Sequence, residues 1–173
     1  MGGHELTPPA PLAEPIRYTS CGLSNVWLAD GYTIESFHGE QTIAIHDLDS
    51  LPHAIGRAVV SAGSLLGGAE IRFLRRHMDL TQAELAGLLG CDVQQVARYE
   101  KDQNHIPGPA DRLLRLLWSE HAGEPVALRS FLAKLSGMRP EAPGRLMFTL
   151  GPQGWRACGD HAARNQEALA VSG

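Results

Sequence analysis

The spacing of apolar residues changes character twice along the chain. Between residues 16 and 46, apolar side chains fall in short runs or alternate with polar ones, as Ile43 and Ile45 do, which predicts strands. From residue 51 to about residue 135 they recur every three or four positions, which predicts amphipathic helices. Short apolar runs return near the end. The pattern therefore predicts an α+β protein, in which a small antiparallel strand meander and a helix precede a bundle of four to five helices and a C-terminal hairpin.

Turn signals place the strands and hairpins. Asp30-Gly31 is typical of a tight turn and predicts a hairpin between residues 26–28 and 32–37. His38-Gly39-Glu40 predicts a second turn before the next strand, and the Gly-Pro-Gln-Gly sequence at 151–154 predicts the terminal hairpin. The expected helices cover residues 51–62, 81–89, 93–101, 110–121 and 125–135. A further helix is expected to start at about residue 69, where Ile71, Leu74 and Met78 form an apolar stripe.

Glycine and proline divide the chain into four parts. Gly67-Gly68 marks a boundary between the N-terminal strands and the helical bundle. The expected parts are a disordered lead at 1–15, a strand-helix unit at 16–66, a domain of helices at 67–122, and a C-terminal helix and hairpin at 123–173, which we expect to contribute to dimerisation.

Charge is distributed unevenly. The net charge of −4 argues by itself against a nucleic-acid partner, but residues 1–68 hold two Lys or Arg against seven Asp or Glu, whereas residues 69–118 hold seven of each. The acidity is therefore concentrated in the N-terminal third, and the middle of the chain can still present a basic face. The basic residues that cluster there are Arg72, Arg75, Arg76, Arg98 and Lys101.

Several classes of protein are disfavoured. No apolar run reaches the roughly 18 residues that span a bilayer, and the N-terminus lacks the pattern of a secretory signal, so a soluble cytoplasmic protein is expected. Three scattered cysteines, none in a CxxC pair, predict neither a disulfide framework nor a zinc site. Because no catalytic motif or phosphate-binding loop is evident, we expect no enzyme activity, metal or cofactor.

The most informative segment is 80–100. Thr81 followed by Glu84 forms a capping box that begins a helix, and Gly90 suits the left-handed conformation that ends it. Asp92 can cap the following helix. Two short helices joined by a tight turn are predicted, and the second would expose polar residues suited to base edges: Gln to adenine and Arg to guanine. The candidate DNA-contacting residues are Thr81, Gln82, Val93, Gln94, Gln95, Arg98, Lys101, Asn104 and His105.

The pattern Thr81-Gln82, Ala86, Gly90, Val96, Glu100 resembles the Xre/Cro-type helix-turn-helix of phage and bacterial repressors. The resemblance implies that Gln82 contacts phosphate and that Val93, Gln94 and Arg98 occupy base-reading positions. It also implies an ion pair between Glu100 and Arg75 of the preceding helix.

A wider resemblance links the chain to MqsA/YgiT-type antitoxins. It is carried by Tyr18, Cys21-Gly22-Leu23, residues 25–28, Gly31-Tyr32 and residues 106–111. Such proteins often combine an N-terminal zinc-binding domain that holds a toxin with a C-terminal Xre domain. This chain keeps only Cys21 where two CxxC pairs would be expected, so the resemblance implies an antitoxin without the zinc-binding cysteines.

The sequence therefore predicts a sequence-specific transcriptional regulator that binds double-stranded DNA, acts as a repressor and forms a homodimer. An antitoxin role with a protein toxin as partner is a further prediction. The dimer contact is expected at Leu128, Phe131, Leu132 and the Trp155 hairpin. Two alternatives stay open. One is a protein-binding module that neutralises a partner through residues 16–62, with DNA secondary, and the other is a small-molecule sensor with its pocket in the N-terminal unit.

Overall fold

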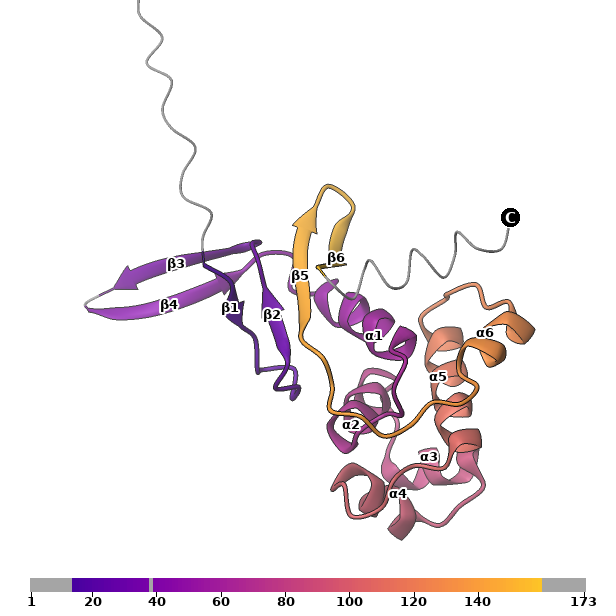
Figure 1. Ribbon diagram of the computed structural model, residues 1–173. Coiled ribbons are helices and arrows are strands. Elements are labelled where there is room, and N and C mark those ends of the chain that lie inside the picture. Colours follow the sequence, from indigo (N-terminus) through magenta and orange to yellow (C-terminus); the bar gives the residue numbers. More distant parts are fainter. Residues whose placement is uncertain (1–13, 38, 160–173) are drawn as a thin grey trace, which may run out of the picture.

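The computed structural model describes residues 14–37 and 39–159, which form six helices and two small sheets (Figure 1). The α+β class is confirmed. The elements in chain order are β1 (Ile16–Arg17), β2 (Val26–Leu28), β3 (Tyr32–Phe37), β4 (Glu40–Ile45), α1 (Leu51–Ser61), α2 (Gly68–His77), α3 (Gln82–Leu89), α4 (Val93–Glu100), α5 (Gly108–His121), α6 (Leu128–Lys134), β5 (Leu146–Gly151) and β6 (Gly154–Cys158).

The larger sheet joins the two ends of the described chain. Its strand order is β1-β2-β5-β6, and β2 pairs in parallel with β5 while the outer pairs are antiparallel. Val26, Leu28 and Phe148 of the two central strands are completely buried, and α1 packs against β6. The predicted terminal hairpin is confirmed as β5–β6.

The hairpin predicted at Asp30-Gly31 is wrong. Instead of pairing with β2, strand β3 pairs with β4, and the two form a separate sheet. The Asp30 carboxylate accepts a hydrogen bond from the Leu150 amide at 2.6 Å, so the aspartate tethers the chain to β5. Gly31 has a φ of +74°, and a Cβ atom there would lie 2.4 Å from the Trp155 ring. The Asp-Gly pair therefore directs the chain past Trp155 and out of the first sheet.

Trp155 itself belongs to the core. Its side chain is 5% exposed, and its indole N–H donates to the His46 carbonyl at 3.0 Å. The Trp155 ring is therefore enclosed by this chain's own residues, and the dimer contact expected at the Trp155 hairpin stays a prediction for the other residues of that hairpin.

The helices follow the apolar periodicity. The predicted helix at 51–62 is α1, and it buries Leu51, Ile55 and Val59 along one face, with Pro52 in its first turn. The four helices α2 to α5 form the predicted bundle, although α5 begins two residues earlier and α6 three residues later than expected. Such small shifts are common because helix ends depend on tertiary contacts.

Helix α1 packs tightly against the bundle at one point. Gly56 of α1 faces Trp118 of α5, and a Cβ atom at Gly56 would lie 2.1 Å from the indole ring. Trp118 is completely buried, and its N–H donates to Nδ1 of His77 in α2 at 3.0 Å. The absence of a side chain at Gly56 thus lets α1, α2 and α5 share one core.

A buried ion pair secures the end of α1. Arg115 and Asp111, one turn apart on α5, are both fully buried and approach to 2.7 Å. The Arg115 guanidinium also donates to the carbonyl oxygens of Val60 at 3.0 Å, Ala62 at 2.8 Å and Ser64 at 2.6 Å. These carbonyls lie where α1 ends, and helix ends leave such groups without partners inside the helix. The guanidinium therefore attaches α1 to the bundle.

We expect Arg115→Met to lower the free energy of unfolding by about 3–5 kcal/mol, because it leaves the buried Asp111 carboxylate without its cation. Urea unfolding of the full chain measures this loss. The matched control is Arg57→Met, which breaks a pair with Glu124 whose arginine side chain is 57% exposed and should cost only about 0–1 kcal/mol. Equal losses in the two variants would contradict the role given to Arg115.

Candidate nucleic-acid interface

The turn between α3 and α4 is formed by the capping residues and the glycine that the sequence analysis predicted. The Thr81 hydroxyl accepts from the Glu84 amide at 3.2 Å, and the Glu84 carboxylate accepts from the Thr81 amide at 2.7 Å. The backbone hydrogen bond from Thr81 lowers the pKa of Glu84. Gly90 has a φ of +69°, and Asp92 accepts from the Gln95 amide at 2.9 Å. The capping box, the glycine stop and the second cap are all confirmed.

One face of α4 anchors the helix. Val96 and Tyr99 of α4 are buried, together with Leu85 and Ala86 of α3. The small Ala86 side chain permits a close approach of α3 and α4, which are packed together. Burial on this face fixes the direction of α4 and leaves its opposite face outward.

The outward face carries the residues predicted to read bases. Val93, Gln94 and Arg98 are exposed, and Val93 retains 42% of its surface. Gln95 is half-buried, and its side-chain oxygen accepts from the Asn104 amide at 3.4 Å. Asn104 thus lies beside α4, next to the exposed loop that also holds Lys101 and His105. The candidate residues therefore gather at the start of α3, along α4 and in the loop after it.

Glu100, at the end of α4, is the centre of a polar cluster. Its side chain is 2% exposed, and its carboxylate accepts from Arg75 Nε at 2.5 Å and from Arg75 Nη2 at 3.1 Å. The pair of Arg75 and Glu100 that the resemblance implied is present. Burial raises the pKa of Glu100, but hydrogen bonds from Arg75 and Gln82 outweigh it and hold the pKa below its ordinary value.

Two further side chains join this cluster. Gln82 Nε2 donates to Glu100 at 2.8 Å, so the Gln82 side chain fixes α3 to α4. Arg72 donates to the Glu100 carbonyl oxygen at 2.6 Å. Arg72 was expected among the clustered basic residues, but its contact with Glu100 was not predicted, although its spacing of three residues from Arg75 places both on one face of α2. The cluster therefore joins α2, α3 and α4 around one carboxylate.

The acidic residues of this region are largely engaged within the fold. The carboxylate of Asp102 accepts from the Gly68 amide at 2.6 Å, while those of Glu100 and Asp111 hold arginines in the interior. Among the described residues, Arg98 and Lys101 form no ion pair. Although residues 69–118 hold equal numbers of acidic and basic residues, Arg98 and Lys101 therefore remain as unpaired cations in the described chain, beside the outward face of α4.

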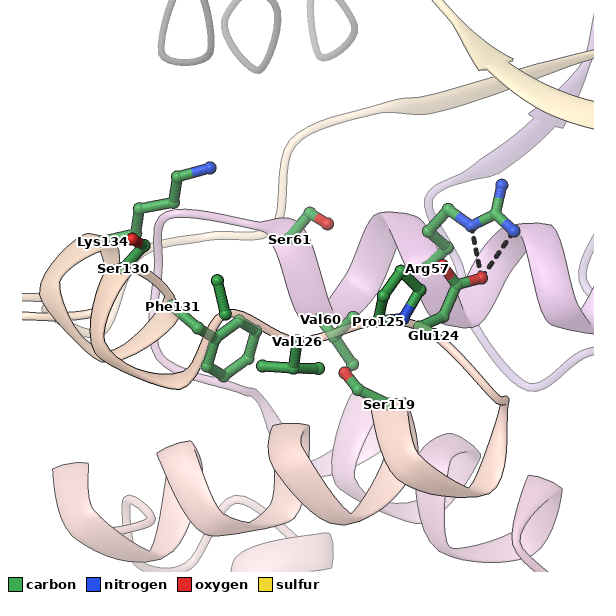
Figure 2. A pocket seen from close by; sticks show the side chains of 11 residues that line it. Arg57, Val60, Ser61, Ser119, Glu124, Pro125, Val126, Ser130, Phe131 and Lys134 are labelled. Atoms are coloured by element: carbon green, nitrogen blue, oxygen red, sulfur yellow. Dashed lines mark hydrogen bonds and ion pairs between the residues drawn. The ribbon is translucent and has the colours of Figure 1, made fainter. Parts of the chain in front are cut away.

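A separate cavity of about 430 Å³ lies between α1, α5 and α6 (Figure 2). Figure 2 shows the ion pair of Arg57 and Glu124 at one end and Phe131 with Lys134 at the other. Burial raises the pKa of Glu124, but hydrogen bonds from His53 and Arg57 outweigh it and lower the pKa overall. The lining combines α1 with the C-terminal part of the chain, so it lies only partly in the N-terminal unit where a sensor pocket was considered.

Two searches of the described residues bear on other functions. Within 14–37 and 39–159, no group of three or more His, Cys, Asp or Glu side chains is placed to hold a metal ion. No helix in this part of the chain is both long and apolar enough to cross a membrane.

Residues 71–109 match a family model described as helix-turn-helix, of the Xre type. This segment of the chain carries a helix-turn-helix. The matched segment contains α3 and α4 completely, together with most of α2, and it supports a DNA-binding regulator. No curated protein and no solved structure matches the chain significantly. The wider resemblance to MqsA/YgiT-type antitoxins therefore stays a prediction.

We expect the contribution of Glu100 to stability to depend on pH. Because its pKa is lowered on folding, its ion pairs stabilise the folded chain above about pH 4.3, the ordinary value for Glu, and this stabilisation is lost as the pH falls through the lower folded value. At pH 7, Glu100→Gln should cost about 1.5–3 kcal/mol, the range for hydrogen bonds to charged groups. Thermal unfolding between pH 7 and pH 3 measures the difference, which should shrink below pH 4. A difference that stays constant would contradict this account.

Proposed function

We propose that the protein is a sequence-specific transcriptional regulator that inserts α4 into the major groove of double-stranded DNA. The observation that carries the proposal is the division of α4 into two faces. Val96 and Tyr99 are buried on one side, while Val93, Gln94 and Arg98 are exposed at the other. An α-helix fits the major groove, where these side-chain types can distinguish base pairs.

Each exposed residue has a proposed role. Arg98 donates to guanine O6 and N7, Gln94 pairs with adenine N6 and N7, and Val93 contacts a thymine methyl group. Gln95, which is half-buried, supports this contact from the side of α4. The residues proposed to hold the phosphate backbone are Thr81, Gln82, Lys101, Asn104 and His105.

We propose that Gln82 contacts phosphate through its backbone and not through its side chain. Its side-chain amide already donates to Glu100, so the group offered to a phosphate is the backbone N–H at the first turn of α3. Free N–H groups at a helix start favour an anion. The backbone N–H of Gln82 is thus proposed to bind the phosphate, while the Gln82 side chain holds α3 in place.

We further propose repression by a homodimer bound to a two-fold operator. Each chain offers one eight-residue reading helix, and a dimer places two such helices about one DNA turn apart. The proposed contact is the surface of α6, where Leu128 is 54% exposed and Phe131 and Leu132 are half-buried. This surface excludes Trp155, which lies in the core.

Arg98→Ala tests the DNA-reading role. We expect the substitution to weaken binding to the specific site by about 1–3 kcal/mol and to leave binding to scrambled DNA nearly unchanged, because a base-reading contact acts on one sequence. The measurement is titration of labelled DNA from upstream of the protein's own gene, alongside scrambled DNA, at about 150 mM salt, since affinity depends strongly on salt.

Arg139→Ala is the matched control, because Arg139 is also exposed but lies after α6, outside the helix-turn-helix and the proposed dimer contact. It should bind both DNAs like the wild type. If Arg98→Ala and Arg139→Ala behave alike, or if the wild type shows no preference between the two DNAs, α4 is not the reading helix.

Leu128→Asp tests the dimer. We expect the wild type to sediment as a dimer at micromolar concentration, and the substitution to shift the equilibrium towards monomer by at least tenfold, because it places a carboxylate in an apolar contact. Sedimentation equilibrium measures the shift. A wild-type chain that is monomeric at these concentrations would rule out the dimer on α6.

A second candidate function is the binding of a protein partner through residues 16–62, as an antitoxin binds its toxin. The observation that favours it is the hairpin of β3 and β4, where Ile34 and Ile43 are about half exposed. The presence of a toxin-like reading frame beside the gene would support this candidate.

A further inference from the structure

The β3–β4 hairpin has two chemically different faces. In its antiparallel register, Tyr32 lies opposite Ile45 and Ile34 lies opposite Ile43. Because successive side chains of a strand point to opposite faces, these four residues share one face. The other face carries Glu35. The base and middle of the hairpin are therefore apolar on this face, whereas the outermost pair on it, Ser36 and Gln41, is polar.

The apolar face extends beyond the body of the protein. Tyr32 and Ile45, at the base of the hairpin, are half-buried and pack against the hydrophobic core. One step further out, Ile34 is 50% exposed and Ile43 is 48% exposed. Figure 1 shows the hairpin reaching away from the helices, on the side of the molecule opposite α5 and α6. The outer isoleucine pair thus continues the core's apolar surface where none of the described chain covers it.

The backbone edges of the hairpin are also free. The sheet contains only β3 and β4 in the described chain, so each strand has one edge with no neighbouring strand. A two-stranded hairpin is only marginally stable alone, and proteins usually protect exposed edges with Lys or Pro. The two strands, YTIESF and EQTIAI, contain neither. The hairpin is therefore open to the addition of a further strand.

The charge of the hairpin indicates what kind of strand would bind along its edge. The chain has no Lys or Arg between Arg17 and Arg57, but this stretch contains five acidic residues, of which Glu35 and Glu40 lie on the hairpin itself. Pairing the edge with a second copy of the same hairpin would bring like charges together, which is unfavourable. A strand with alternating apolar and basic residues would meet both the isoleucines and the carboxylates favourably.

We propose that the β3–β4 hairpin is the docking surface for a basic partner protein, which adds a strand to the hairpin edge and covers Ile34 and Ile43. The inference deepens the second candidate function by naming the surface and the chemistry of the partner. It is independent of the DNA-reading role of α4, because the two surfaces share no residue.

The test uses the full-length protein and two defined probes. The first is an eight-residue peptide that alternates valine and lysine, and the second is its counterpart with glutamate in place of each lysine. Binding is followed by backbone amide shifts in two-dimensional NMR at about 150 mM salt, which limits non-specific attraction between exposed charges. We expect the lysine peptide to bind at least tenfold more tightly than the glutamate peptide, with shifts concentrated in residues 32–45.

Two double variants locate the contact. Ile34→Thr with Ile43→Thr keeps β-branched side chains but removes the apolar pair, and Glu35→Gln with Glu40→Gln removes the charge. Each should weaken binding of the lysine peptide at least tenfold. Leu113→Thr is the matched control at an exposed leucine on α5, outside the dimer contact proposed on α6, and should bind like the wild type. Unchanged circular dichroism and unchanged affinity for specific DNA show that the variants are folded.

No binding of the lysine peptide to the wild type, equal binding by the hairpin variants, or equal affinity for the two peptides would each overturn the proposal. A wild-type dimer that dissociates in the isoleucine double variant would also overturn it, by assigning the surface to a second copy. Because DNA affinity is measured on the same variants, failure of the hairpin proposal is distinguishable from failure of the DNA-binding proposal.

Discussion

The arrangement of the whole chain depends on how the Arg115 guanidinium is satisfied in the interior. A charge without water is tolerated only when it is paired and fully hydrogen-bonded. Arg115 meets this requirement with the Asp111 carboxylate and with carbonyl oxygens released at the end of α1. Because Asp111 also accepts from the Leu66 amide, the segment between α1 and α2 is held at both ends. The N-terminal unit is therefore attached to the helix-turn-helix by specific polar contacts as well as by apolar packing.

Glu100 plays a similar part inside the helix-turn-helix. Its carboxylate joins Arg75 of α2 and Gln82 of α3 to the end of α4, so the helix proposed to read DNA is fixed at its C-terminal end from two sides. Precise placement matters because contacts with base edges are directional hydrogen bonds. The same arrangement explains how a region with balanced charges can present cations. Its buried or capping carboxylates serve the fold, while Arg98 and Lys101 remain outside.

The sequence predicted what is encoded locally and missed what depends on distant partners. Thr81, Glu84, Gly90 and Asp92 act within a few residues of their own positions, so the two helices and their turn were identified correctly. The parallel pairing of β2 with β5 joins Val26 to Leu146 and has no local signal. For the same reason, Asp30-Gly31 was interpreted as a hairpin turn, although Asp30 binds β5. The exposed residues of α4 were predictable from the resemblance, whereas the exposed isoleucines of the hairpin became evident only when β3 was found outside the main sheet.

The most direct test of the central claim, that α4 reads DNA sequence, is selection of binding sites from a random pool of duplexes by the wild type and by Arg98→Gln. The account predicts that the wild type enriches one motif, and that the variant changes base preference at a single position of that motif, because glutamine favours adenine where arginine favours guanine. Enrichment of no motif, or of the same motif with unchanged preference at every position, would contradict it.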